Sequence, residues 1–352
     1  MSNAEQVKFA FELQRTWCEE AGSPFMAQLM QCFADELAAP GPVHDLIGDW
    51  PGNPIADALM MRIAGALQAA ALSGRDPSLA AQYPWSRADW SMSDFWPAAR
   101  AFMQREREWC AAFLTSPPQT NETRRSIPLL PGFLRLARLG PLHTLEIGAS
   151  AGLNLNWDRF RYETSTWSWG EAGRPLMDTE WRGAPPDALD AHVVVASRAG
   201  CDRNPIDITD PEQALRLRSY IWADQPDRFT RLDAAIALAK QAGVQPERAD
   251  AGAWLAARLA APLPEGVTVV YHSVVWQYLS NETRAAIEAA IASAAARADD
   301  AHRLAHLRLE PNPFIGVEGR VDDMGVDMRL WPSGERRLLC KTHGHARWVE
   351  QI

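Results

Sequence analysis

A short glycine-containing motif at residues 144–155 carries the strongest chemical signature of the sequence. The run is Thr144-Leu145-Glu146-Ile147-Gly148-Ala149-Ser150-Ala151-Gly152-Leu153-Asn154-Leu155, and an apolar-periodic segment follows it as far as Phe160. This order predicts a strand, a tight turn and a helix. Gly148 and Gly152 permit a positive φ or the close approach of another group, and unpaired N–H groups that open a helix favour an anion. The motif therefore predicts a nucleotide or carboxylate site, with a small-residue turn that binds no ligand as the alternative.

The same residues also fit a serine hydrolase. Gly148-x-Ser150-x-Gly152 matches the nucleophile elbow, which likewise requires a strand, a sharp turn and a helix. A triad would draw its remaining members from Asp202, Asp207, Asp250, His272, His343 and His345. A hydrolase normally places several strands and an oxyanion loop before its elbow, whereas the first 140 residues here have helical periodicity. Glu146 has no role in an elbow, but it could order the turn or accept a hydrogen bond from a ligand ammonium. Hydrolysis is therefore the alternative to nucleotide binding.

Composition excludes several classes of function. The 352 residues include 35 basic and 44 acidic side chains, and no basic run exceeds two residues, so we expect no nucleic-acid partner. There is no uninterrupted apolar stretch of 18 residues and no secretory signal at the start, so we expect a cytoplasmic protein without a membrane partner. The five cysteines are scattered, and His343 and His345 have no adjacent Asp, Glu or Cys. We therefore expect neither disulfides nor a metal site.

Helical periodicity dominates residues 1–139. Apolar spacing between Glu5 and Leu37 predicts two helices separated at Gly22-Ser23-Pro24. Residues 40–54 are rich in proline and glycine and predict a connecting loop. Further helices are predicted at 56–72, 77–81, 96–114 and 129–139. We expect residues 1–139 to form a helical N-terminal cap or substrate module.

Strands alternate with helices in residues 140–352. Strands are predicted before Gly148 and at 192–196, 244–250, 267–276 and 306–310, with helices at 153–160, 210–221, 226–241, 254–260 and 283–297. Residues 162–190 predict a hairpin insertion, and the runs 328–331 and 336–341 predict a terminal antiparallel hairpin. The alternation predicts an α/β fold with a mostly parallel sheet and right-handed crossovers.

The central motif and its flanks resemble class I S-adenosylmethionine-dependent methyltransferases. A dinucleotide-binding fold would need G-x-G-x-x-G, but Ser150 replaces the middle glycine and the spacing differs. The methyltransferases share the acidic strand end, a G-x-[GS]-x-G turn, later carboxylates near ribose and adenine, and a terminal antiparallel hairpin. The resemblance implies a Rossmann-like methyltransferase sheet preceded by the all-helical module. It implies S-adenosylmethionine as the cofactor and a small molecule as the methyl acceptor.

The resemblance also assigns residues to the cofactor. Asp202 or, in second place, Asp207 matches the ribose carboxylate, and Asp250 matches the position near adenine. The cofactor-binding residues that we expect are Glu146, Gly148, Ala149, Ser150, Gly152, Asn154, Asp202, Asp250, Ala251 and Ser273.

Catalytic and substrate-binding residues are expected near the same edge of the sheet. His272 lies near the end of a predicted strand and could remove a proton from the acceptor, because its ordinary pKa is near neutrality; a strand-end histidine satisfied by a backbone carbonyl is the alternative. Glu122 lies in a polar segment, residues 116–125, which either reaches over the ligand or is a solvated loop. We expect His272 and Glu122 to be catalytic, and we expect the substrate to contact Gln119, Asn121, Arg125, Tyr271 and Trp276. Trp222 and Asp224 could instead be a packing and capping pair at a helix boundary.

A second resemblance covers nearly the whole chain. The segments that carry it are Gln119-Thr120-Asn121-Glu122, Leu145–Leu155 with Asp158-Arg159-Phe160, Trp222-Ala223-Asp224-Gln225 with Arg228 and Leu232, and His343-Gly344. Together they are similar to the bacterial family called domain of unknown function 2332. This resemblance supports the predicted fold. It leaves three functions open: a methyltransferase, a serine hydrolase, or a non-catalytic protein that binds a nucleoside or a partner.

Overall fold

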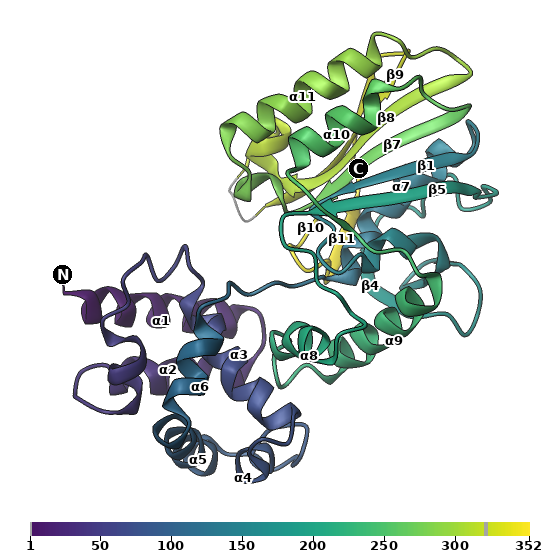
Figure 1. The fold of residues 1–352 in the computed structure, drawn as a ribbon. Helices are drawn as coiled ribbons and strands as arrows, with labels where there is room; N and C mark the ends of the chain where they lie inside the picture. Colours follow the sequence, from purple (N-terminus) through teal and green to yellow (C-terminus); the bar gives the residue numbers. More distant parts are fainter. Residues whose placement is uncertain (1, 320–322) are drawn as a thin grey trace. The chain divides into compact units, whose positions relative to one another are not determined.

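The protein consists of two compact units (Figure 1). The computed structural model describes residues 2–319 and 323–352. A helical unit contains Met1–Thr120 and Thr209–Thr230, and an α/β unit contains Asn121–Ile208 and Arg231–Ile352. This division differs from the predicted boundary after residue 139. The helix at 126–137 belongs to the α/β unit because its apolar side chains cover the sheet, and residues 209–230 return to the helical unit.

The helical unit confirms most of the helices predicted from apolar spacing. Its elements are α1 (Asn3–Glu20), α2 (Pro24–Glu36), the π-helix η1 (His44–Gly48), α3 (Leu59–Leu72), α4 (Pro77–Ala80), α5 (Met92–Arg105), α6 (Arg107–Leu114) and α8 (Pro211–Ser219). The long helix predicted at 96–114 is two helices, because the backbone leaves helical geometry at Glu106 (φ −110°, ψ 34°). Helix α9 (Pro226–Ala242) begins in this unit and continues in the α/β unit.

Asp224 caps helix α2 from a distant part of the sequence. Ser23 occupies the N-cap position, but its side chain makes no capping bond. Asp224 Oδ2 instead accepts a hydrogen bond from the Phe25 N–H at 3.0 Å, and Oδ1 accepts one from the Ser23 hydroxyl at 2.5 Å. Trp222 and Ala223 are buried in the core of the same unit. The predicted packing and capping pair is therefore confirmed.

The α/β unit is built on one mixed, mostly parallel sheet. Its strands are β1 (Leu142–Ile147), β2 (Arg161–Thr164), β3 (Ser168–Trp169), β4 (Leu176–Arg182), β5 (Val195–Asp202), β6 (Glu247–Arg248), β7 (Gly266–Ser273), β8 (His302–Pro311), β9 (Met324–Trp331), β10 (Glu335–Thr342) and β11 (Trp348–Gln351). They lie in the order β3-β2-β4-β11-β10-β9-β8-β7-β1-β5-β6.

The parallel half of the sheet reverses its strand order beside β1. The chain passes outward from β1 to β5 and β6, then returns to the other side of β1 with β7 and β8. In open α/β sheets, ligands bind at the carboxyl edge where such a reversal occurs. The carboxyl ends of β1 and β7 therefore mark the edge at which a ligand site is expected.

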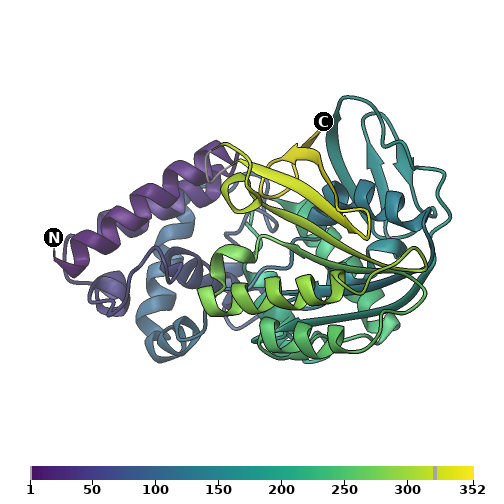
Figure 2. The ribbon, with the colours of Figure 1, turned by 90° about the horizontal axis from the view of Figure 1, so that it is seen from above.

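The other half of the sheet joins the chain terminus to the insertion. The predicted terminal hairpin is confirmed, because β9 pairs antiparallel with both β8 and β10. Strand β11 was not predicted; it pairs antiparallel with β10 and parallel with β4 of the insertion. In Figure 2 the yellow carboxyl-terminal segment accordingly lies beside the teal insertion.

Different helices cover the two faces of the sheet. Helix α7 (Ser126–Ala137) packs on one face, where Phe133 contacts Tyr271 of β7. Helices α10 (Ala251–Ala260) and α11 (Asn281–Ala295) lie side by side over the opposite face (Figure 1), and their apolar side chains form a core with Val270 and Leu304. No helix among the described residues is long and apolar enough to span a membrane.

Three predicted elements in the α/β unit need correction. The helix expected at 153–160 is the 3-10 segment η3 (Leu153–Arg159), which is interrupted by non-helical geometry at Asn156. The strand expected at 192–196 is β5 at Val195–Asp202, and the one expected at 244–250 is reduced to Glu247–Arg248. Local apolar runs located these elements approximately, but pairing with β1 and with β5 sets their limits.

We predict that Asp224→Ala destabilises the helical unit by about 1 to 2 kcal/mol, because the Phe25 N–H loses its capping acceptor. Asp35→Ala is the matched control, since Asp35 is an exposed carboxylate on the same helix. Urea denaturation, with hydrogen exchange measured at the first turn of α2, tests the difference. Equal stability of the two variants would contradict the capping role.

Candidate functional site

The loop after β1 is held in a constrained backbone conformation. Gly148, Ser150 and Gly152 have φ angles of 69°, 53° and 71°. A positive φ is unusual for serine. The Ala149 N–H donates to the Cys201 carbonyl at 3.0 Å, which ties the loop to the end of β5. The loop is therefore fixed by backbone bonds between the ends of neighbouring strands.

Close packing against neighbouring side chains explains why residues 148 and 152 are glycines. A Cβ atom on Gly148 would lie 2.4 Å from Val275 Cγ2, and one on Gly152 would lie 2.9 Å from Pro246 Cδ. Val275 belongs to the turn after β7, and Pro246 precedes β6. The Cβ positions of both glycines are thus covered by protein side chains, so a ligand would have to contact other atoms of the loop.

Asp202 stabilises the loop, and the Ser150 hydroxyl has no hydrogen-bond partner among the described residues. Asp202 Oδ2 accepts the Ser150 N–H at 2.9 Å, and Oδ1 accepts the Asn204 N–H at 2.8 Å. Ser150 is only 6% exposed, and its Oγ has no hydrogen-bond partner in the part of the chain that the structure describes. Buried hydroxyl groups normally form hydrogen bonds. A polar ligand bound at this edge would supply an acceptor for the Ser150 hydroxyl.

The segment that follows residue 120 anchors the far side of the loop. Asn121 Oδ1 accepts the Leu153 N–H at 3.0 Å, and the Asn154 side-chain amide donates to the Glu122 carbonyl at 3.3 Å. One of the N–H groups predicted to bind a ligand is therefore already occupied by protein. Glu122 is 8% exposed, so the alternative of a solvated loop is wrong for this part of the segment.

Glu122 faces a histidine near the chain terminus. Its Oε2 lies 3.5 Å from His345 Nδ1. Arg125 Nε donates to the Gly344 carbonyl at 3.1 Å, and the His345 N–H donates to His343 Nδ1 at 3.1 Å. Burial, reinforced by the neighbouring His345, lowers the pKa of His343 to about 4, so this ring is neutral at neutral pH. The sequence suggested His345 as a candidate base only for the alternative hydrolase triad, and not as a catalytic residue of a methyltransferase.

Glu146 lies beneath the loop in a buried aromatic environment. It pairs with Tyr271 across β1 and β7, and the Tyr271 hydroxyl oxygen lies 3.1 Å from Glu146 Oε2 and 3.3 Å from the Asn154 carbonyl. Burial raises the pKa of Glu146 to about 8. A protonated Glu146 can donate to Tyr271 while Tyr271 donates to Asn154, so both contacts are satisfied at once. Both side chains therefore order the loop from below.

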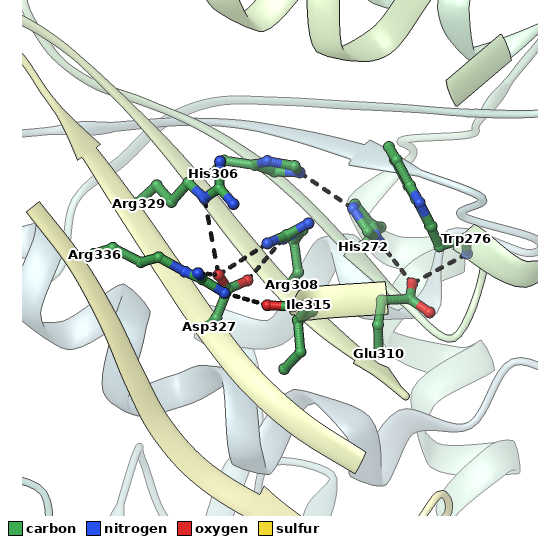
Figure 3. A network of polar contacts seen from close by, with 9 residues as sticks. All are labelled: His272, Trp276, His306, Arg308, Glu310, Ile315, Asp327, Arg329 and Arg336. Carbon is green, nitrogen blue, oxygen red and sulfur yellow. Dashed lines mark hydrogen bonds and ion pairs between the residues drawn. The ribbon is translucent and has the colours of Figure 1, made fainter. Parts of the chain in front are cut away.

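His272 lies on the opposite face of the sheet from Tyr271, since neighbouring strand residues alternate, and Trp276 packs against His272 there. His272 is fully buried; its Nδ1 lies 2.7 Å from Glu310 Oε1 and its Nε2 lies 3.1 Å from His306 Nε2 (Figure 3). Burial lowers the pKa of His306 well below its ordinary value, so this ring is neutral. Trp276 stacks on His272 with ring centroids 5.2 Å apart. With both ring nitrogens engaged inside the protein, His272 is not placed to take a proton from a substrate, which corrects that expectation.

Other predicted residues are placed around this edge or away from it. Asp250 follows β6 and caps α10, because Oδ1 accepts the N–H groups of Gly252 and Ala253 and Oδ2 accepts the Thr283 hydroxyl. Ala251 opens α10 and Ser273 ends β7. Gln119 belongs to the helical unit, whereas Asn121 belongs to the α/β unit. Asp207 accepts a bond from Gln245 at 3.3 Å.

Within residues 2–319 and 323–352 the arrangement offers polar groups but neither a metal-ligand cluster nor a catalytic triad. Among the described residues, no group of three or more His, Cys, Asp or Glu side chains could hold a metal ion. Within the same residues, no histidine hydrogen-bonds to Ser150 Oγ. The site is therefore a constrained loop at the strand reversal, with a carboxylate on one side and the Glu122–His345 pair on the other.

Comparison with known proteins identifies the family. The family model described as an uncharacterized protein conserved in bacteria (DUF2332) matches residues 8–351, and the chain belongs to that family. No curated protein and no solved structure matches the chain.

We predict that the contribution of Glu146 to the stability of the α/β unit falls as pH rises from 5 toward 8. Its folded pKa is about 8 and its ordinary pKa is 4.5, so the folded protein holds a proton that the unfolded chain releases. This contribution is complete below the ordinary pKa and disappears as pH rises through the folded one. One pKa unit corresponds to about 1.4 kcal/mol. The stability of wild type relative to Glu146→Gln, measured by denaturation at several pH values, should therefore fall as pH rises, and a difference that does not change with pH would contradict the prediction.

Proposed function

We propose that this DUF2332 protein binds S-adenosylmethionine in its α/β unit and transfers the methyl group to a small-molecule acceptor. The observation that carries the proposal is the position of three features on neighbouring parallel strands. The glycine loop follows β1, Asp202 ends β5, and Asp250 follows β6. All three lie at the carboxyl edge beside the reversal of strand order, where α/β proteins bind nucleotides.

The residues at this edge fit an adenosyl ligand. The Ser150 hydroxyl, buried and without a partner among the described residues, could bond to a polar group of the ligand. Asp202 already holds the loop and would accept bonds from ribose hydroxyls; Asp250 would face the adenine side. S-adenosylmethionine supplies an electrophilic methyl group when bound, so the protein has to position the acceptor and, where needed, accept its proton.

Glu122 and His345 are the groups that we assign to proton transfer. Glu122 is buried and its carboxylate lies 3.5 Å from His345 Nδ1, whereas the His345 side chain is 38% exposed. A carboxylate beside Nδ1 favours the tautomer in which Nε2 accepts a proton. In this proposal Glu122, predicted from sequence to be catalytic, is a positioning residue that acts through His345, and His345 takes the role first expected of His272.

The serine hydrolase alternative receives little support from these contacts. It requires a histidine beside Ser150, and Ser150 Oγ has no such partner among the described residues. The positive φ of Ser150 would also suit a strained nucleophile elbow, so it does not separate the two functions. A serine-directed probe therefore serves as the control that separates them.

We predict that S-adenosylmethionine or S-adenosylhomocysteine at 100 times its Kd stabilises the protein by about 2.7 kcal/mol, seen as a rise in Tm. Gly148→Ala should abolish this rise, because its Cβ would collide with Val275 and displace the loop. Gly243→Ala is the matched control: Gly243 has the same φ of 69°, but its Cβ would meet nothing within 4 Å. Both variants carry the same backbone strain, so only the collision distinguishes them.

The outcomes separate the three functions. Stabilisation with methyl transfer to an acceptor supports the proposal, and stabilisation without transfer to any acceptor offered identifies a binding protein. No rise in Tm with millimolar ligand contradicts the proposal. Labelling by a fluorophosphonate probe that disappears in Ser150→Ala would establish a hydrolase instead.

A further inference from the structure

The face of the sheet opposite Glu146 contains a buried cluster of titratable side chains. His306, Arg308 and Glu310 alternate along β8 and share a face with His272 of β7 (Figure 3). Within this cluster, two acidic residues form separate pairs. Glu310 forms a hydrogen bond with His272. Asp327 of β9 accepts hydrogen bonds from Arg308 Nε at 2.7 Å and from Arg308 Nη2 at 2.8 Å. Both carboxylates are 1% exposed.

Glu310 differs from Asp327 because it also holds the turn after β7. Its Oε1 accepts the Val275 N–H at 2.9 Å and the Trp276 N–H at 3.2 Å, in addition to His272 Nδ1 at 2.7 Å. The turn begins at Val274, whose φ of 54° is rare for a β-branched residue. A strained turn persists only where the surrounding contacts hold it. The Val274 N–H donates to the Leu309 carbonyl at 2.8 Å, and Glu310 holds the next two residues from the interior.

The turn held by Glu310 packs against the glycine loop. Val275 Cγ2 occupies the space in which a Cβ of Gly148 would lie, at 2.4 Å. A continuous chain of contacts therefore links His272 and Glu310 through the backbone of Val275 to Gly148. The contacts described for Asp327 are with Arg308, Arg329 and Arg336, none of which belongs to the turn.

We propose that Glu310, oriented by His272, is a positioning residue that sets the Val274–Trp276 turn against Gly148 and so shapes the loop that receives the adenosyl ligand. This inference rests on the proposed function for its ligand. In this proposal His272 acts by orienting Glu310, and it does not contact the methyl acceptor. The Asp327–Arg308 pair, equally buried on the same face, has no such role.

Binding measurements with matched variants test the proposal. We expect Glu310→Gln to weaken binding of S-adenosylhomocysteine, measured by calorimetry on the full chain, by roughly tenfold, since a neutral acceptor makes weaker hydrogen bonds. Glu310→Leu removes the acceptor and should weaken binding further. Asp327→Asn should remain within about twofold of wild type, because its pair does not contact the turn. Unchanged affinity in Glu310→Gln, or equal losses in Glu310→Gln and Asp327→Asn, would overturn the proposal.

Hydrogen exchange gives a readout that does not need the ligand. In Glu310→Gln the amides of Val275 and Trp276 and those of residues 148–152 should exchange faster, while Asp327→Asn should leave them as in wild type. If wild type binds no S-adenosylhomocysteine, the proposed function fails, but faster exchange at 148–152 would still support the positioning role. Unchanged exchange at these amides overturns that role whatever the ligand result.

Discussion

The contact between Gly148 and Val275 is the constraint on which the ligand edge of this protein depends. It joins the loop after β1 to the turn after β7, the two strands between which the strand order reverses. No side chain at residue 148 could coexist with Val275 in its present position, and the positive φ of residue 148 independently favours glycine. The glycine loop and the turn after β7 are both strained, and they pack closely against each other. The shape of the edge therefore depends on the contacts that stabilise each of these two segments.

Each segment is held by a buried carboxyl group on a different face of the sheet. Glu146 and Tyr271 support the glycine loop from the side covered by α7, and Glu310 supports the turn from the side covered by α10 and α11. Buried carboxyl groups are costly unless they are hydrogen-bonded or protonated. Here Glu146 meets that requirement through its raised pKa, and Glu310 meets it through three donors. Asp202, at the end of β5, also stabilises the glycine loop because it accepts the Ser150 N–H.

Much of this fold could be predicted from periodicity, whereas most of the site could not. The run Val267–Trp276 and the alternation of strands with helices predicted the parallel strands, and Gly22-Ser23-Pro24 marked a helix boundary correctly. The helix expected after Gly152 was wrong, because Asn121 and Glu122 bind the start of that segment and hold it as a 3-10 turn. Such long-range hydrogen bonds leave no local pattern in the sequence.

The hydrogen-bond partners of the predicted site residues could not be predicted from local sequence either. His272 was correctly expected at a strand end, but its burial between Glu310 and His306 depends on register with β8. The alternating polar residues of His306-Leu307-Arg308-Leu309-Glu310 were a usable signal for a polar strand face. The approach of Glu122 to His345 joins segments more than 200 residues apart, and no spacing rule reaches that far.

A crystal structure of the protein with S-adenosylhomocysteine tests the central claim most directly. The account predicts the adenosyl group at the carboxyl edge between β1 and β7, with a ribose hydroxyl bonded to Asp202 and the glycine loop in contact with the ligand. A ligand bound elsewhere, or an edge that stays closed at saturating ligand with Ser150 bonded to a histidine, would contradict it.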